Sequence, residues 1–87
     1  MVMTTNMIIL SGTTVQTIVG ANNNRTFLTI QNIGSQTLFL GGSGNVTSSI
    51  GYPIFPGAVY EDSIYTGSYF GVAPTGSNTT ITYIEED

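Results

Sequence analysis

Residues 26–33 read TFLTIQNI and carry apolar side chains at alternating positions on both sides. Leu28 and Ile30 share one face of an extended strand, while Phe27 and Ile33 share the other. An isolated sandwich has a polar outer face, so apolar residues on both faces indicate a second buried surface, such as an oligomer interface. Because single exposed apolar residues are common, a plain monomer remains the alternative.

Short runs rich in Thr, Val, Ile, Tyr and Phe recur along the whole chain, separated by Gly, Asn, Ser and Pro at spacings of about 8–12 residues. They predict strands at 7–10, 14–19, 26–33, 37–40, 45–48, 58–65, 68–73 and 79–84. This rhythm leaves no room for crossover helices. It predicts an all-β fold, a small antiparallel β-sandwich of about seven or eight short strands, either jelly-roll-like or immunoglobulin-like.

The domain organisation follows from the absence of any linker or internal repeat. Residues 13–87 are expected to form a single sandwich domain, preceded by residues 1–12 as an N-terminal arm or edge strand. As a free arm, residues 1–6 would reach a neighbour and add a strand to its sheet.

The composition excludes several classes of function. Among 87 residues the only cation is Arg25, set against five acidic residues, and there is no cysteine or histidine. Binding to nucleic acid or to an anionic membrane needs several cations, so neither is expected as a partner. A nucleophilic hydroxyl needs a neighbouring base, and His and Lys are both missing, so we expect neither an enzyme nor a bound cofactor or metal.

Three motifs suggest chemistry but have simpler interpretations. The adjacent Glu61 and Asp62 point to opposite faces of a strand, so they cannot act as a glycosidase pair. The glycine run at residues 41–44 lacks the Lys-Ser/Thr of a phosphate-binding loop and is interpreted as a turn. The acidic residues 85–87 lack the spacing of a calcium site and are interpreted as a frayed tail.

Five residues are candidates for contact with a partner. They are Met7, Ile9, Arg25, Tyr52 and Phe55. Phe55 lies in a proline-flanked loop and is the aromatic residue least suited to the core. Tyrosines supply amphipathic contact area, either for a protein interface or for stacking on sugar rings.

Arg25 has two possible partners. As the only cation it either pairs with Glu61 or Asp62 within the protomer or reaches an acidic group on another chain.

A longer pattern, spanning about residues 13–84, resembles a known class of proteins. It consists of Asn24-Arg25, FLTIQNIG at 27–34, LFLG at 38–41, Val46-Thr47, GYPI at 51–54, Pro56-Gly57 and ITYI at 81–84. The pattern resembles small β-sandwich virion proteins of tailed phages, of the head decoration (cement) and head-fibre type. The stretch 52–55 is bulkier than this class leads one to expect.

The resemblance implies a location in the virion, on the outer capsid surface or on a neck or tail component, after synthesis in the host cytoplasm. It implies many copies, often as homotrimers, in contact with the major capsid protein or neighbouring virion proteins. The leading hypothesis is a capsid decoration protein that stabilises the shell. The alternatives are a head-fibre, neck or tail accessory protein, and a small carbohydrate- or host-surface-binding module.

Overall fold

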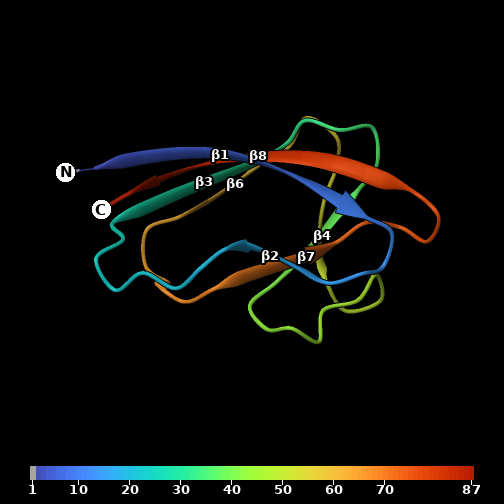
Figure 1. Ribbon diagram of the computed structural model, residues 1–87, viewed down its shortest axis with the longest axis horizontal. Coiled ribbons are helices and arrows are strands. Elements are labelled where there is room, and N and C mark those ends of the chain that lie inside the picture. Colours follow the sequence, from blue (N-terminus) through green and yellow to red (C-terminus); the bar gives the residue numbers. More distant parts are fainter. Residues whose placement is uncertain (1) are drawn as a thin grey trace.

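The computed structural model describes residues 2–87, which form eight β-strands joined by turns and loops (Figure 1). The strands are β1 (Met3–Ser11), β2 (Gln16–Val19), β3 (Phe27–Asn32), β4 (Leu38–Gly41), β5 (Tyr52–Ile54), β6 (Val59–Asp62), β7 (Tyr69–Val72) and β8 (Asn78–Glu86). They pair into two antiparallel sheets, sheet A with the order β1-β8-β3-β6 and sheet B with the order β2-β7-β4-β5. The predicted all-β antiparallel sandwich is confirmed. No helix in this part of the chain could cross a membrane.

The strand order distinguishes between the two topologies that the sequence leaves open. Consecutive strands change sheet at every connection except that between β4 and β5, and β8 returns to lie between β1 and β3. Eight strands divided in this way between two four-stranded sheets form a jelly roll. An immunoglobulin-like sandwich instead divides its strands as ABED and CFG. The chain is therefore a jelly roll.

The core lies between the sheets and follows the alternation in the sequence. Leu28 and Ile30 of β3 are fully buried, whereas their neighbours Phe27, Thr29 and Gln31 are only partly buried. The same alternation sets the buried faces of β4 and β8. The core residues are Leu10, Ile18, Val19, Leu28, Ile30, Leu38, Leu40, Ile54, Tyr69, Ala73, Ile81 and Tyr83.

A buried asparagine joins the two sheets. Asn32 of β3 is 0% exposed, and its Nδ2 donates to the carbonyls of Gln36 (2.7 Å) and Ile54 (2.8 Å). Its Oδ1 accepts hydrogen bonds from the Gly34 N–H (3.1 Å) and the Thr79 hydroxyl (2.8 Å). Because Ile54 belongs to sheet B, this one side chain holds the sheets in register with all of its polar atoms satisfied.

The predicted strand at 45–48 is wrong. This segment forms turns, in which the Thr47 hydroxyl oxygen accepts hydrogen bonds from the N–H groups of Ser49 and Ile50. Such local side-chain bonds offer the backbone an alternative to strand pairing.

The loop at residues 42–51 instead folds back onto the end of sheet B. A Cβ added at Gly41 would lie 2.8 Å from the Val46 Cβ, and one added at Gly51 would lie 2.6 Å from the Phe39 Cβ. Val46 is buried although it lies outside the core between the sheets. The two glycines therefore allow this loop to pack closely.

Several strand boundaries also differ from the sequence prediction. Pro53, expected in a loop, lies in β5, where an edge strand tolerates a residue without an N–H. The strand predicted at 58–65 ends at Asp62, because the Asp62 carboxylate accepts hydrogen bonds from the N–H groups of Ile64 and Tyr65 and closes a turn.

The N-terminal segment is part of the sandwich. β1 pairs without interruption with β8, from Met3 opposite Glu86 to Ser11 opposite Asn78. Val2 and Asp87 exchange two further backbone hydrogen bonds. The prediction of a free arm at residues 1–6 is therefore wrong for residues 2–6, because β8 is long enough to pair with all of β1; Met1 lies outside the described residues. β1 forms one edge of sheet A.

Candidate interaction surfaces

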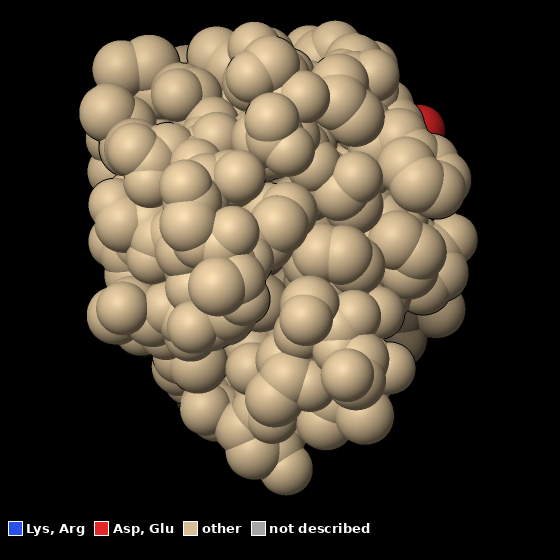
Figure 2. Space-filling model, turned by 90° about the vertical axis from the view of Figure 1, so that its right-hand side faces the viewer, with Lys and Arg blue, Asp and Glu red and all other residues tan. Residues whose placement is uncertain are grey.

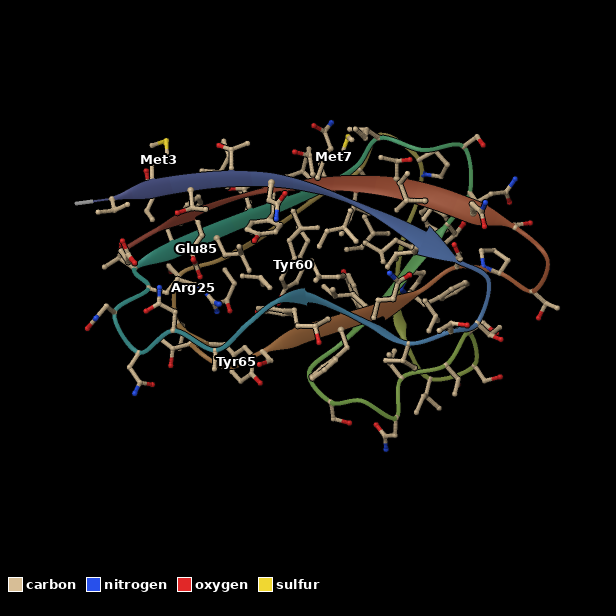
Figure 3. All side chains as sticks on the ribbon, viewed as in Figure 1. Met3, Met7, Arg25, Tyr60, Tyr65 and Glu85 are labelled. Atoms are coloured by element: carbon tan, nitrogen blue, oxygen red, sulfur yellow. The ribbon has the colours of Figure 1, made fainter. Side chains whose placement is uncertain are left out.

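The outer face of sheet A exposes apolar side chains that nothing in the described chain covers. Met7 and Ile9 of β1 are 60% and 55% exposed, and Figure 3 shows Met3 and Met7 pointing away from the sandwich. Other exposed apolar residues on or beside this face come from β6, from β8 and from the position directly after β3. They are Ile33, Val59 and Ile84.

The register shows that this face is continuous across the sheet. Met7 lies opposite Thr82, Thr82 opposite Gln31, and Gln31 opposite Val59. A shallow hollow of about 130 Å³ lies on this face, lined by Thr5, Thr29, Gln31, Thr82, Tyr83 and Ile84. The face thus combines methyl groups, hydroxyl groups and the amides of Gln31 and Asn78, and its only charged residues are Glu61 and Glu86.

The charged residues gather at one end of the sandwich. Arg25 and Glu85 lie near the termini in Figure 3, and the acidic residues 86 and 87 follow directly. The opposite end carries the loops β1–β2, β3–β4 and β7–β8, which contain no charged residue. Figure 2 views that end and shows a single acidic atom at its margin. A partner that docks away from the termini therefore meets almost no charge.

Arg25 is buried and forms its ion pair within the protomer. It is 6% exposed, and its Nε donates to Glu85 Oε2 at 2.7 Å. Its remaining donors bind the carbonyls of Gly20 (2.6 Å), Gly67 (3.0 Å) and Tyr65 (3.3 Å). Of the two alternatives, pairing within the protomer is the one observed, but the partner is Glu85 and not Glu61 or Asp62. The reason is that β8, which carries Glu85, lies beside the start of β3.

Tyr52 and Phe55 lie on or next to β5, away from Met7 and Ile9. Both are exposed, at 64% and 63%, as expected for contact candidates. The ring of Tyr52 lies 6.2 Å from that of Tyr60, so an aromatic contact bridges the neighbouring edges of sheets B and A.

The aromatic row continues through the buried Tyr69 to the exposed Tyr65. The ring of Tyr60 lies 5.7 Å from that of Tyr69, and Tyr69 lies 5.2 Å edge-on from Tyr65. The Tyr60 and Tyr69 hydroxyls are 3.1 Å apart, and Tyr69 donates a 2.5 Å hydrogen bond to Asp62 Oδ2.

The Tyr69–Asp62 contact shifts the titration of both groups. The hydrogen bond from Tyr69 is the main cause that lowers the pKa of the Asp62 carboxyl below its usual 3.8. Burial is the main cause that raises the pKa of the Tyr69 hydroxyl well above its usual 10, and the bond to Asp62 acts in the same direction. At neutral pH an ionised Asp62 and a protonated Tyr69 therefore fix the turn after β6. No sequence motif signals this pair, whose members belong to different sheets.

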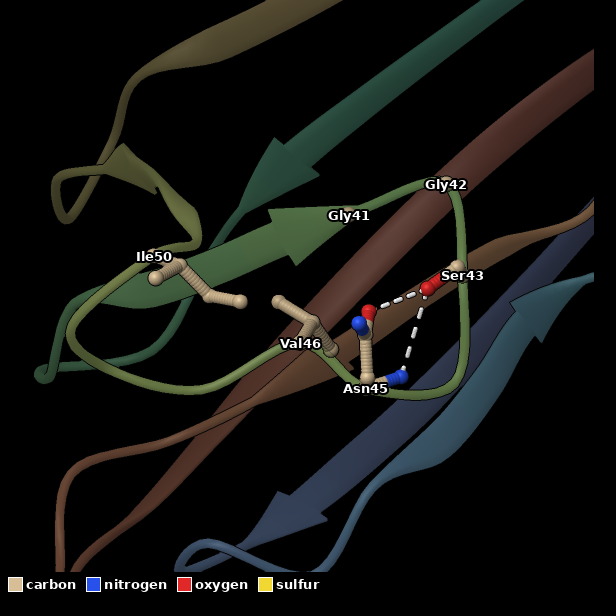
Figure 4. Close-up of a pocket in the computed structure, with 6 residues that line it drawn as sticks. All are labelled: Gly41, Gly42, Ser43, Asn45, Val46 and Ile50. Atoms are coloured by element: carbon tan, nitrogen blue, oxygen red, sulfur yellow. Dashed lines mark hydrogen bonds between the residues drawn. The ribbon is translucent and has the colours of Figure 1, made fainter.

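The glycine run at 41–44 borders a second hollow, of about 340 Å³ (Figure 4). Its lining is Gly41, Gly42, Ser43, Asn45, Val46 and Ile50, and a hydrogen bond joins the side chains of Ser43 and Asn45. No helix follows the run, so the helix N-terminus that makes a glycine loop bind phosphate is not there. Within residues 2–87 no three acidic side chains converge as metal ligands.

The structure thus divides the five candidate contact residues into three groups. Met7 and Ile9 share the outer face of sheet A, Tyr52 and Phe55 lie at β5, and Arg25 is internal. The sequence prediction did not name Val59 and Ile84 as contacts. The alternation along β6 and β8 could have identified them, because both residues lie on the face of their strand that points away from the core.

Comparisons with known proteins address the fold. No family model and no curated protein matches the chain. A similar solved structure is the solution NMR structure of a de novo designed double-stranded β-helix, with a TM-score of 0.66 and 15% sequence identity. The match covers 95% of this chain and 99% of the designed one. At that identity the likeness shows a shared fold alone.

Proposed function

We propose that this chain is a structural protein of a tailed-phage virion, which decorates the outer capsid and binds it through the outer face of sheet A. The observation that carries the proposal is that face itself, because Met7, Ile9, Val59 and Ile84 are exposed on the outside of a sandwich whose core is already complete. Apolar surface of this kind, with few charged groups, is typical of sites that are buried against other proteins.

Two further features support the proposal. Jelly rolls are a recurrent fold of viral capsid proteins, although lectins use them as well. The sequence pattern that resembles phage decoration proteins runs through Arg25 and Asn32, and both have structural roles in the sandwich. The resemblance therefore concerns the framework of the fold and is compatible with the same framework here.

The mechanism is thermodynamic linkage. A protein that binds the assembled shell but not its dissociated subunits stabilises the shell by a free energy that grows with the logarithm of its concentration relative to the dissociation constant. The sandwich needs no catalytic group for this role, only a preformed surface that loses little entropy on binding.

The test is co-sedimentation of the purified protein with phage particles that lack it. Ile84→Asp places a charge in the centre of the outer face and is expected to weaken binding at least tenfold, because a desolvated charge opposes burial of the interface. Ile64→Asp is the matched control, since Ile64 lies in the exposed loop after β6. Equal binding by wild type and both variants would remove the outer face from the proposal.

A carbohydrate-binding module is the second candidate, favoured by the aromatic contact between the exposed Tyr52 and the half-buried Tyr60. Sugar rings stack on exposed aromatic faces, and the nearby hydroxyls could accept or donate hydrogen bonds. This function predicts saturable glycan binding that Tyr52→Ala abolishes and Ile84→Asp leaves unchanged. Retention of glycan binding in Tyr52→Ala would exclude this site.

A further inference from the structure

The sandwich has four edge strands, and three of them are protected against pairing. β6 is four residues long and carries Glu61 and Asp62, while β5 has only three residues, one of them Pro53. β2 has four residues and an irregular register between Thr17 and Val19. Short length, charge, proline and bulges are the features by which natural sheets prevent further strands from adding to an edge.

The fourth edge strand, β1, has none of these features. Its nine residues, MTTNMIILS, contain no charge, no proline and no glycine. Its register with β8 is unbroken from Met3 to Ser11. A long, regular, uncharged edge is a template for another strand.

The alternation of hydrogen bonds between β1 and β8 shows which backbone N–H and C=O groups of β1 face the open edge of the sheet. Val2 and Asp87 exchange two backbone hydrogen bonds, and Gly12 donates to Ser77 in the same phase. Antiparallel pairs alternate, so the even-numbered residues of β1 bond to β8 and the odd-numbered residues turn their N–H and C=O groups to the open edge. The latter are Met3, Thr5, Met7, Ile9 and Ser11.

Within the described chain only two side chains reach these edge amides. Asn6 Oδ1 accepts the N–H of Met7 at 2.8 Å, and Gln16 Oε1 accepts the N–H of Ser11 at 3.2 Å. Both contacts are exposed, so a pairing strand can replace them.

We propose that β1 pairs with β1 of a second copy of this chain, antiparallel about a two-fold axis at Met7. In that register Met7 lies opposite the Met7 of the second copy, Thr5 opposite Ile9, and Met3 opposite Ser11. Thr5, Met7 and Ile9 exchange both of their edge hydrogen bonds with their counterparts, whereas the Ser11 carbonyl already accepts the Thr14 N–H at 3.4 Å. The two copies of sheet A then form one continuous eight-stranded sheet with a shared outer face.

The other edges and the charge distribution identify the occupant as a second copy. Because the other three edges are protected, the matching edge that this chain offers is β1 itself. Met3 lies beside Glu86 and Ser11 beside Asn78, so antiparallel pairing sends the two acidic ends in opposite directions. The interface is isologous and closes as a dimer, which uses up the last unprotected edge.

The experiment is light scattering during size-exclusion chromatography over a concentration series, with two substitutions at β1. Met7→Lys places two ammonium groups side by side at the axis, and Val59→Lys is its control on the far edge of the same face. Thr5→Pro removes an edge N–H that β8 does not use, and Thr5→Ala is its control.

Wild type, Val59→Lys and Thr5→Ala are expected at twice the 9.2 kDa mass of the chain, and Met7→Lys and Thr5→Pro at the single mass. Amide exchange by NMR is expected to show slow exchange at Thr5 and Ile9 in wild type and fast exchange in Met7→Lys. A wild type that stays monomeric at every concentration overturns the proposal, as does a trimer or a Met7→Lys variant that dimerises normally. The pairing does not depend on a virion role, so its failure leaves the particle-binding proposal standing.

Discussion

Replacement of Asn32 by alanine tests the account of how the two sheets are joined. The side chain is fully buried and makes four hydrogen bonds, two as donor to carbonyls and two as acceptor. Alanine removes all four and leaves the Ile54 carbonyl without the Asn32 donor, whereas the Gln36 carbonyl keeps the Thr79 hydroxyl at 2.9 Å. The Gly34 N–H and the Thr79 hydroxyl lose an acceptor at the same time.

The expected loss follows from the number of bonds. A typical hydrogen bond contributes about 0.5–1.5 kcal/mol net, so four predict a loss of roughly 2–6 kcal/mol. A chain of this length has a total stability of roughly 4–13 kcal/mol. Asn32→Ala is therefore expected to remove a large part of the free energy of unfolding and to lower the melting temperature by more than about 10 °C.

Urea unfolding followed by tyrosine fluorescence or circular dichroism measures the loss. Asn23→Ala is the matched control, since Asn23 is exposed, and it is expected to change the stability by less than about 0.5 kcal/mol. A loss below about 1 kcal/mol for Asn32→Ala would refute the reasoning, because the sheets would then be held together without this network.

Three further substitutions test other contacts. In Gly34→Ala the new Cβ would lie 2.5 Å from the Thr80 backbone N, so we expect a loss of about 1–3 kcal/mol in urea unfolding, and an unchanged midpoint would contradict the close approach. Arg25→Met keeps the length of the side chain but leaves its partly buried acidic and carbonyl partners unpaired, and is expected to cost about 3–5 kcal/mol by thermal unfolding. A variant as stable as wild type would disprove the structural role. Tyr69→Phe removes the donor to Asp62. The stability that comes from the lowered Asp62 pKa is present above about pH 4 and lost as the pH falls further, whereas that from the raised Tyr69 pKa is present below pH 10 and lost as the pH rises further. The difference in unfolding free energy between wild type and Tyr69→Phe should therefore be largest at intermediate pH and become smaller at both lower and higher pH. A difference that is constant with pH would show that the hydrogen bond between Tyr69 and Asp62 is absent.

The parts of the fold that the sequence predicts are those set by local periodicity. Alternation within 26–33 correctly assigns Leu28 and Ile30 to the core, because a strand with one buried face must place its largest apolar side chains on that side. The long-range order of the strands does not follow from periodicity, since the jelly roll and the immunoglobulin-like sandwich share the same local patterns.

The errors also have physical causes. Thr47 is a good strand residue, yet its hydroxyl bonds to the following amides and makes a turn. Pro53 indicates a loop, yet an edge strand accepts it. The partner of Arg25 depends on β8 lying beside β3, a fact of topology that neighbouring residues do not encode.

The candidate site was predictable only in outline. Met7 and Ile9, named as contact candidates from the sequence, are exposed, but their membership in one continuous face with Val59 requires the register of four strands. The unprotected edge of β1 likewise becomes visible only when the other edges are known.

The most direct test of the proposed virion role is the copy number of this protein in particles purified from a lysate that produces it. Quantitative mass spectrometry against the major capsid protein gives that ratio. A decoration role predicts a fixed ratio that is a large fraction of the capsid protein, unchanged by further purification. A few copies per particle would move the protein to the neck, tail or fibres, and its absence from particles would contradict the virion role altogether.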